Sequence, residues 1–317
     1  MATDWRIVEE ITRASGSNLW FVSRALGAGR RRFFNAAYAS MRLIDDFVDL
    51  DFLTRPAPDR HTGRAAALQA IDAWEAGVRR AACGEVVTGE TDTRQATVFR
   101  CLSETLGHSD LGARSWSALA EAMRHDVNER EIITWDDFLA YCRGATMAPA
   151  EVFVYVLACR EQDGGYHRPE GVNCADLARD MAVFCYLVHI MRDLRKDALA
   201  QAQLVTLPVE MLSGYGLSRD GLAGAFDDPK RKDAVIALIG ALDGKAWQYR
   251  IDMKAAVKDL QPLLGRRERS ILKSLLAIYT GLHDRITANP AAVLDESVCD
   301  TQMRAQLEIV EAGEELT

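Results

Sequence analysis

Two stretches of this 317-residue chain carry carboxylates at a spacing suited to metal and phosphate chemistry. The first contains Arg42, Asp45, Asp46 and Asp49. Their spacing of three or four places them on one face of a helix, where like charges repel one another. Mg²⁺ would gather them, because it takes oxygen ligands from carboxylates and substrate phosphates. Taken alone, the pattern also fits a solvated acidic face.

The second stretch has the same character and strengthens the metal interpretation. It contains His189, Arg192, Asp193 and Asp197, with His189 and the two aspartates four residues apart. Two such faces can oppose each other, so that metal ions neutralise a leaving diphosphate while Arg42 and Arg192 hold its oxygens. The predicted metal ligands are Asp45, Asp46, Asp49, Asp193 and Asp197. Protonated His189 is a further candidate for binding the diphosphate.

These stretches resemble the two aspartate motifs of squalene and phytoene synthases. Residues 38–49, YASMRLIDDFVD, are similar to the first motif, and residues 192–197, RDLRKD, to the second. The resemblance extends from about residue 15 to 285, through Leu207-Pro208 and Tyr279. It implies an all-α, single-domain helical bundle of the isoprenoid-synthase type, with a central active-site cavity, over residues 1–290. Residues 291–317 would form a C-terminal helix and an acidic tail.

The resemblance also implies an activity. It is that of a Mg²⁺-dependent prenyltransferase, a transferase of alkyl groups other than methyl, with Mn²⁺ as an alternative ion. Such an enzyme ionises an allylic isoprenyl diphosphate, here C15 or C20, and couples it head-to-head to a second one. NADPH is needed only if the product is squalene. Tyr38, Tyr141 and Tyr279 would line the path of the carbocation, and small residues such as Gly144 and Ala148 would leave room for a prenyl chain.

Several residues depart from the family pattern and leave the acceptor and product open. Met147 and Pro149 lie where relatives have a glycine-containing run, His189 replaces the usual Asn, and Thr206 replaces a tyrosine. A prenyltransferase with another acceptor, such as an aromatic ring, is one alternative. A non-catalytic scaffold or assembly factor is another, although a scaffold has no reason to retain all five motif aspartates.

Composition narrows the class of protein. The net charge of −8 argues against nucleic-acid binding, which requires a basic surface. Seven scattered cysteines without a C-x-x-C pair fit reduced thiols. The acidic N-terminus lacks an export signal, and no apolar run reaches the roughly 18–20 residues of a transmembrane helix. We therefore expect a cytoplasmic protein whose membrane contact, if any, is peripheral. The oligomeric state stays open.

Helical periodicity runs along most of the chain, and three local expectations follow. Pro56 and Pro58 predict a loop over residues 51–64, which could act as a lid. Asp126 is a weak candidate for the site, with a surface charge as the favoured interpretation. Thr134, followed by Asp136 and Asp137, predicts a helix start at which the acids face the helix dipole.

Overall fold

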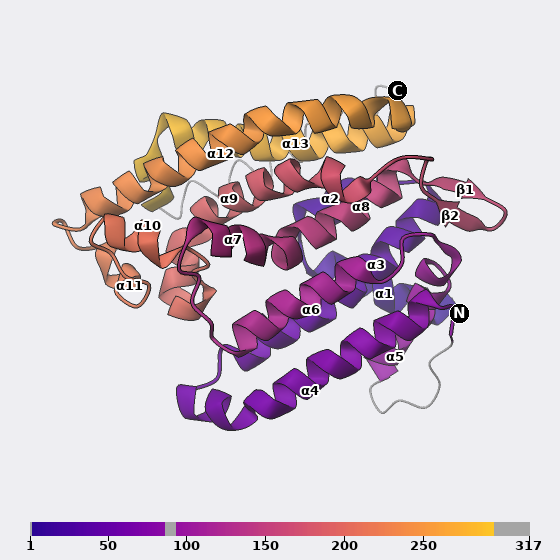
Figure 1. The fold of residues 1–317 in the computed structure, drawn as a ribbon, viewed down its shortest axis with the longest axis horizontal. Helices are drawn as coiled ribbons and strands as arrows, with labels where there is room; N and C mark the ends of the chain where they lie inside the picture. The colour runs from indigo at the N-terminus through magenta and orange to yellow at the C-terminus, as the bar shows by residue number, and fades with distance from the viewer. Residues whose placement is uncertain (1, 86–92, 295–317) are drawn as a thin grey trace. The chain divides into compact units, whose positions relative to one another are not determined.

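The computed structural model describes residues 2–85 and 93–294, and this part of the chain is almost entirely helical (Figure 1). Its two strands, β1 (Arg160–Gln162) and β2 (Gly165–His167), form one short antiparallel hairpin. The all-α prediction is confirmed. None of the helices described here is long and apolar enough to cross a membrane. The helix and tail expected over 291–317 lie outside the described residues, except for the 3₁₀-helix η6 (Pro290–Leu294).

The chain forms two compact units. The first holds the described residues up to Arg130, together with Ala140–Arg179 and Ala255–Ile271. The second holds Glu131–Leu139, Asp180–Lys254 and the described residues from Leu272 onward.

The helices come in the following order. The N-terminal ones are α1 (Ala2–Ala14), α2 (Asn18–Ser23), α3 (Ala28–Asp46), the π-helix η1 (Phe47–Phe52), α4 (Ala57–Ala82), α5 (Thr93–Ser103), the 3₁₀-helix η2 (Leu106–His108) and α6 (Arg114–Val127). The central ones are α7 (Trp135–Cys142), the π-helix η3 (Arg143–Met147), α8 (Ala148–Ala158) and α9 (Cys174–Ala200). The last are the 3₁₀-helix η4 (Ala202–Leu204), α10 (Val209–Gly214), α11 (Leu222–Ala225), α12 (Lys232–Leu260), the 3₁₀-helix η5 (Gln261–Leu263) and α13 (Arg266–Ala288).

The helix with the first carboxylates is fixed in the first unit by a buried serine. Ser40 on α3 is fully buried, and two indole N–H groups meet it. Trp74 Nε1 of α4 donates to the Ser40 carbonyl at 2.9 Å, and Trp116 Nε1 of α6 donates to the Ser40 hydroxyl at 2.8 Å. Buried indoles need such acceptors. α4 and α6 are thereby held against α3 two residues before Arg42.

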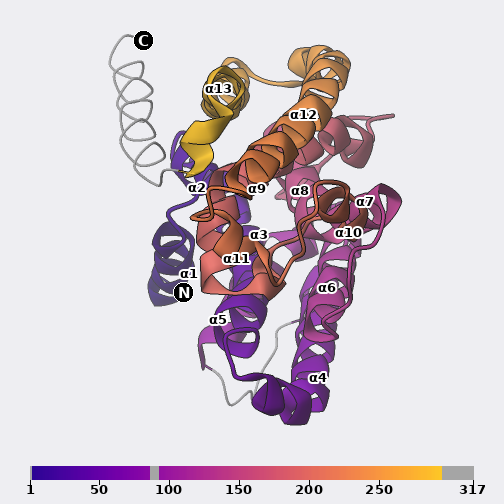
Figure 2. The same cartoon turned by 90° about the vertical axis from the view of Figure 1, so that its left-hand side faces the viewer.

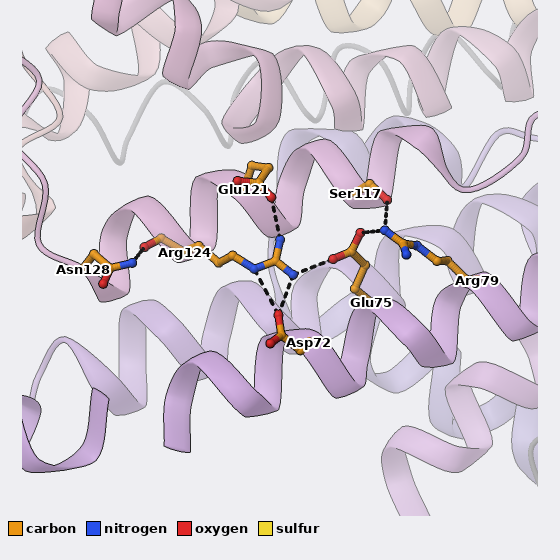
Figure 3. Close-up of polar contacts among 7 residues, drawn as sticks. All are labelled: Asp72, Glu75, Arg79, Ser117, Glu121, Arg124 and Asn128. Atoms are coloured by element: carbon orange, nitrogen blue, oxygen red, sulfur yellow. Dashed lines mark hydrogen bonds and ion pairs between the residues drawn. The ribbon is translucent and has the colours of Figure 1, made fainter. Parts of the chain in front are cut away.

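α4 also lies alongside α6, where an ion-pair network joins them (Figures 1 and 2). Arg124 of α6 is at its centre and reaches Asp72 at 2.7 Å and the buried Glu75 at 2.6 Å, both on α4 (Figure 3). Glu75 also pairs with Arg79. Because the guanidinium fork fits carboxylates, this network fixes the register of α4 on α6.

In the second unit, polar side chains join α12 to α13 around a fully buried histidine. His283 of α13 has Nε2 3.0 Å from Asp243 Oδ1 and Nδ1 3.0 Å from Arg250 Nη1, both on α12. Thr287 donates to the same Asp243 oxygen at 2.6 Å.

The start of α7 fits the sequence prediction, since Thr134 and Asp137 cap each other's backbone N–H groups.

Candidate functional site

The first carboxylate stretch begins on α3 and ends in the π-helix η1. Arg42 Nη1 is 2.7 Å from Asp45 Oδ2, and its Nη2 is 2.5 Å from Asp46 Oδ1. Helical spacing of three and four residues places these side chains on one face and so allows these contacts. Arg42 Nε is buried without a hydrogen-bond partner in the described part of the chain.

Asp49 follows in η1, where its carboxyl lies in an acidic and largely buried place. Burial raises the pKa of Asp49 to about 8, and the charges of Asp45, Asp126 and Asp46 add to this effect. Arg42 acts in the opposite direction but does not compensate. A cation bound here would remove the cost of ionising Asp49.

The structure contradicts the favoured interpretation of Asp126 as a surface charge. Asp126 lies in the last turn of α6, largely buried, and accepts a hydrogen bond from the Tyr141 hydroxyl at 2.9 Å. His125 Nδ1 is 3.4 Å from its other oxygen. Burial raises the pKa of Asp126 above its usual value, although both partners oppose this. The sequence could not show the burial because Tyr141, fifteen residues later, covers the carboxyl.

In the second unit, α9 presents the other stretch. Arg192 binds Asp193 through two parallel contacts, Nε to Oδ1 at 2.8 Å and Nη2 to Oδ2 at 2.6 Å. The exposed His189 places Nε2 2.8 Å from the same Oδ2. Burial alone would raise the pKa of Asp193, yet the hydrogen bonds from Arg192 and His189 hold it well below its usual value. Asp193 is the carboxylate of this stretch that is already neutralised.

Asp197 differs from Asp193 although it lies one turn further along α9. Burial, followed by the charge of Asp193, raises the pKa of Asp197 to about 6. Each stretch therefore contains at least one carboxylate that is paired with an arginine. Each also contains one carboxyl group, Asp49 or Asp197, whose surroundings supply too little positive charge to offset its raised pKa.

This donor set fits a hard divalent ion. All five motif side chains offer carboxylate oxygens, which Mg²⁺ prefers, and Asp49 and Asp197 need positive charge. Within the described ranges, no group of three His, Cys, Asp or Glu side chains is arranged to hold a metal ion. Mg²⁺ usually binds through one or two carboxylates, with phosphates and water completing its shell, so neither stretch by itself needs to supply a complete set of ligands.

The predicted tyrosines and small residues lie on different elements. Tyr38 is on α3 and Tyr141 on α7, both half-buried in the first unit, and Tyr279 is half-buried on α13 in the second. Gly144 in η3 packs against α6: a Cβ added there would lie 2.8 Å from Ala122 Cβ and closer still to the Ala118 carbonyl. Close packing of η3 against α6 thus accounts for the absence of a side chain at Gly144.

Ala148 begins α8 immediately after η3, and it is buried. The structure introduces a π-helical turn at each of two predicted site segments, η1 at Asp49 and η3 at Gly144. Such turns are rare and occur often at functional sites. No sequence signal predicted them.

The prediction of a loop over residues 51–64 is wrong. η1 continues to Phe52, and α4 already begins at Ala57, with Pro56 at its N-cap and Pro58 in its first turn. Proline is favoured at the first helical positions because its missing N–H is not needed there. Both prolines therefore start a helix, and the connection between η1 and α4 shortens to residues 53–56.

Comparisons with known proteins agree over most of the chain. Residues 12–307 match the family described as squalene/phytoene synthase. A phytoene synthase from Thermus thermophilus is 25% identical over 252 residues, which is 78% of this chain and 72% of the relative.

Solved structures show the same fold. A squalene synthase, HpnC, from Alicyclobacillus acidocaldarius superposes with a TM-score of 0.67 at 22% identity, over 90% of this chain and 94% of that one. A dehydrosqualene synthase in complex with ligand gives a TM-score of 0.69 at 17% identity, over 100% of this chain and 98% of that one. Because the family match spans most of its length and the helical fold agrees, the chain belongs to the squalene/phytoene synthase family.

Proposed function

We propose that this protein is a Mg²⁺-dependent prenyltransferase that ionises an allylic isoprenyl diphosphate and couples it head-to-head to a second one. The observation that supports this most directly is the pairing of carboxylates with an arginine on both α3 and α9, in a member of this family. Both stretches act on the same substrate in this proposal. The proposed substrates are C15 or C20 diphosphates.

The residues have distinct roles in this mechanism. Asp45, Asp49, Asp193 and Asp197, assisted by Asp46, would hold Mg²⁺, which when bound neutralises the charge developing on the leaving diphosphate. Arg42 and Arg192 would bind diphosphate oxygens through their guanidinium groups.

The chemistry itself breaks one bond and forms new ones in the substrates. The allylic C–O bond breaks, and diphosphate leaves with the electron pair. The double bond of the second substrate then attacks the carbocation, and loss of a proton closes a cyclopropyl diphosphate. The rings of Tyr38, Tyr141 and Tyr279 would stabilise positive charge along this path. NADPH enters only if the product is squalene.

We also propose a cytoplasmic location with at most peripheral membrane contact. The support is the set of free thiols, which the structure shows at six cysteines within its described part.

The test is to incubate the purified protein with Mg²⁺ and C10, C15 or C20 diphosphates, separately and mixed. Released diphosphate is assayed, and extracts are analysed by mass spectrometry. We expect a cyclopropyl diphosphate or a C30 or C40 hydrocarbon, no turnover in EDTA, and no turnover by Asp45→Ala or Asp193→Ala, both of which should stay helical.

The same experiment separates the alternatives. Full activity in EDTA would contradict the metal mechanism. Diphosphate consumption only when an aromatic acceptor is added would indicate a different prenyltransferase. Release of no diphosphate under any condition would favour a non-catalytic role. Asp51→Ala is the matched control, because Asp51 is exposed in η1, pairs with Arg55 and lies outside the motif.

A further inference from the structure

Glu129, two residues beyond the end of α6, has an unusual backbone and an unusual set of partners. Its φ angle is +52°, in the left-handed region that non-glycine residues rarely adopt. Its N–H donates to the Asp126 carbonyl at 2.8 Å. A residue persists in this conformation only where its surroundings hold it there.

Two arginines of α4 hold the Glu129 carboxylate. Arg60 donates from Nε to Oε1 and from Nη2 to Oε2, both at 3.1 Å, and Arg64 Nη2 adds a third contact at 2.9 Å. Arg60 is buried, so its fork is largely removed from water, while Glu129 itself is half-buried. These charge-assisted contacts hold the pKa of Glu129 below its usual value.

The same arginines bind backbone carbonyls on both sides. Arg64 Nε donates to the Val127 carbonyl at the end of α6, at 3.1 Å. Arg60 Nη1 donates to the Arg55 carbonyl at 2.6 Å, in the short connection that joins η1 to α4. The arrangement, which we call the Glu129 clamp (Glu129, Arg60 and Arg64), therefore joins the end of α6, the start of α4 and the exit of η1.

Two of the joined segments, α6 and η1, each carry a carboxyl of the candidate site. Asp126 lies three residues before Glu129, and Asp49 lies in η1. α6 packs against η1, and the two carboxyls are close enough for their charges to interact. A shift of the end of α6 relative to η1 would therefore change the separation of Asp126 and Asp49.

We propose that Glu129 is a positioning residue, which acts through Arg60 and Arg64 to hold Asp126 at a fixed place beside Asp49. This rests on the proposed function. Glu129 does not touch the substrate. Its contribution is to pre-organise the site, where a displacement of about 1 Å can cost about a hundredfold in rate.

The test compares Glu129→Gln, which keeps the shape and removes the charge, with Arg64→Gln, which leaves the Arg60 fork intact and is the milder change. The control is Glu75→Gln, which removes a buried carboxylate that also joins α4 to α6 but pairs with Arg124 and Arg79 (Figure 3). The measurements are kcat, KM and the Mg²⁺ concentration for half-maximal rate, at a temperature where circular dichroism shows all variants folded.

We expect Glu129→Gln to lower kcat about tenfold or more and to raise the half-saturating Mg²⁺ concentration, with Arg64→Gln changing both in the same direction by less. Glu75→Gln should change neither by more than about twofold, because Glu75 pairs with Arg124 and Arg79 and, within the described residues, shares no partner with the Glu129 clamp. A second readout needs no turnover: the rise in melting temperature caused by Mg²⁺ plus inorganic diphosphate should shrink in Glu129→Gln and Arg64→Gln only.

Two results would overturn the proposal. One is wild-type kcat and Mg²⁺ dependence in folded Glu129→Gln and Arg64→Gln. The other is an equal loss in Glu75→Gln, which would show that the clamp only holds the helices together. Failure of the proposed function is distinguishable, because the unmodified protein itself would then release no diphosphate.

Discussion

At the scale of single residues, the departures from the family pattern bear on specificity. Met147 is the last residue of η3, and Pro149 lies in the first turn of α8. Met147 is half-buried, and it occupies volume that a glycine would leave empty. A site that couples two C20 chains needs more room than one that couples two C15 chains.

Met147→Gly should therefore raise turnover of C20 diphosphate relative to C15 by about tenfold, because a few methylenes in an apolar pocket are worth this much discrimination. The ratio is measured by competition, with mass spectrometry of the products. Met147→Leu, which conserves volume, is the control. If the unmodified protein already uses C20 as readily as C15, Met147 does not narrow the site.

At the scale of elements, the contact between α4 and α6 depends on buried carboxylates. Burial opposes ionisation of Glu75, but hydrogen bonds from Arg124 and Ser117 and the charges of Arg124 and Arg79 hold its pKa below the usual value. A carboxyl with a depressed folded pKa stabilises the protein above its unfolded pKa, and this stabilisation is lost as the pH falls through the folded pKa.

Glu75→Gln should consequently be less stable than the unmodified protein at neutral pH, and the difference should shrink on acidification below about pH 4.5, where an unfolded glutamate begins to bind protons. Urea unfolding at a series of pH values measures this. Glu121→Gln is the control, because Glu121 pairs with the same Arg124 from an exposed position. A stability difference that stays constant down to pH 3 would contradict the assigned role.

The contact between η3 and α6 also depends on one residue, because it requires a glycine at position 144. Gly144→Ala would press a methyl group into the Ala118 carbonyl and Ala122. We expect a destabilisation of about 1–3 kcal/mol from overpacking, measured by thermal or urea unfolding. Gly240→Ala on α12 is the control, because open space surrounds Gly240 and alanine there should stabilise by about 0.5–1 kcal/mol. If Gly144→Ala leaves the free energy of unfolding unchanged, the contact between η3 and α6 can shift to accommodate a methyl group.

At the scale of the whole molecule, the two carboxylate stretches belong to different compact units. If both act on one diphosphate, as proposed, a ligand that binds the folded protein stabilises it through both units at once. A free ligand concentration of a hundred times the dissociation constant adds about 2.7 kcal/mol to the free energy of unfolding.

Mg²⁺ plus inorganic diphosphate should accordingly raise the melting temperature of the unmodified protein, and Asp45→Ala and Asp193→Ala should each abolish the increase. The double variant should behave like either single one. Differential scanning calorimetry with Mg²⁺ alone, diphosphate alone and both together checks this. If one of the single variants retains the full shift, the stretch that it alters does not bind this ligand.

The helical class and the set of charged residues in each carboxylate stretch follow from the order of the amino acids alone. The contacts of Arg42 with Asp45 and Asp46, and of Asp193 with His189 and Arg192, join residues at most four positions apart. Helix geometry brings residues three or four positions apart onto one face, so the spacing was sufficient to predict that shared face, although not the ion pairs themselves.

The surroundings of these residues depend on how the helices pack in three dimensions. Asp126 is covered by Tyr141, Gly144 is pressed against α6, and Glu129 is held by Arg60 and Arg64, all from distant parts of the chain. The start of α4 at Ala57 was misjudged because Pro56 and Pro58 suit a loop or a first helical turn equally well. Burial and partner choice depend on which helices pack together, and that is a property of the folded chain rather than of any local pattern.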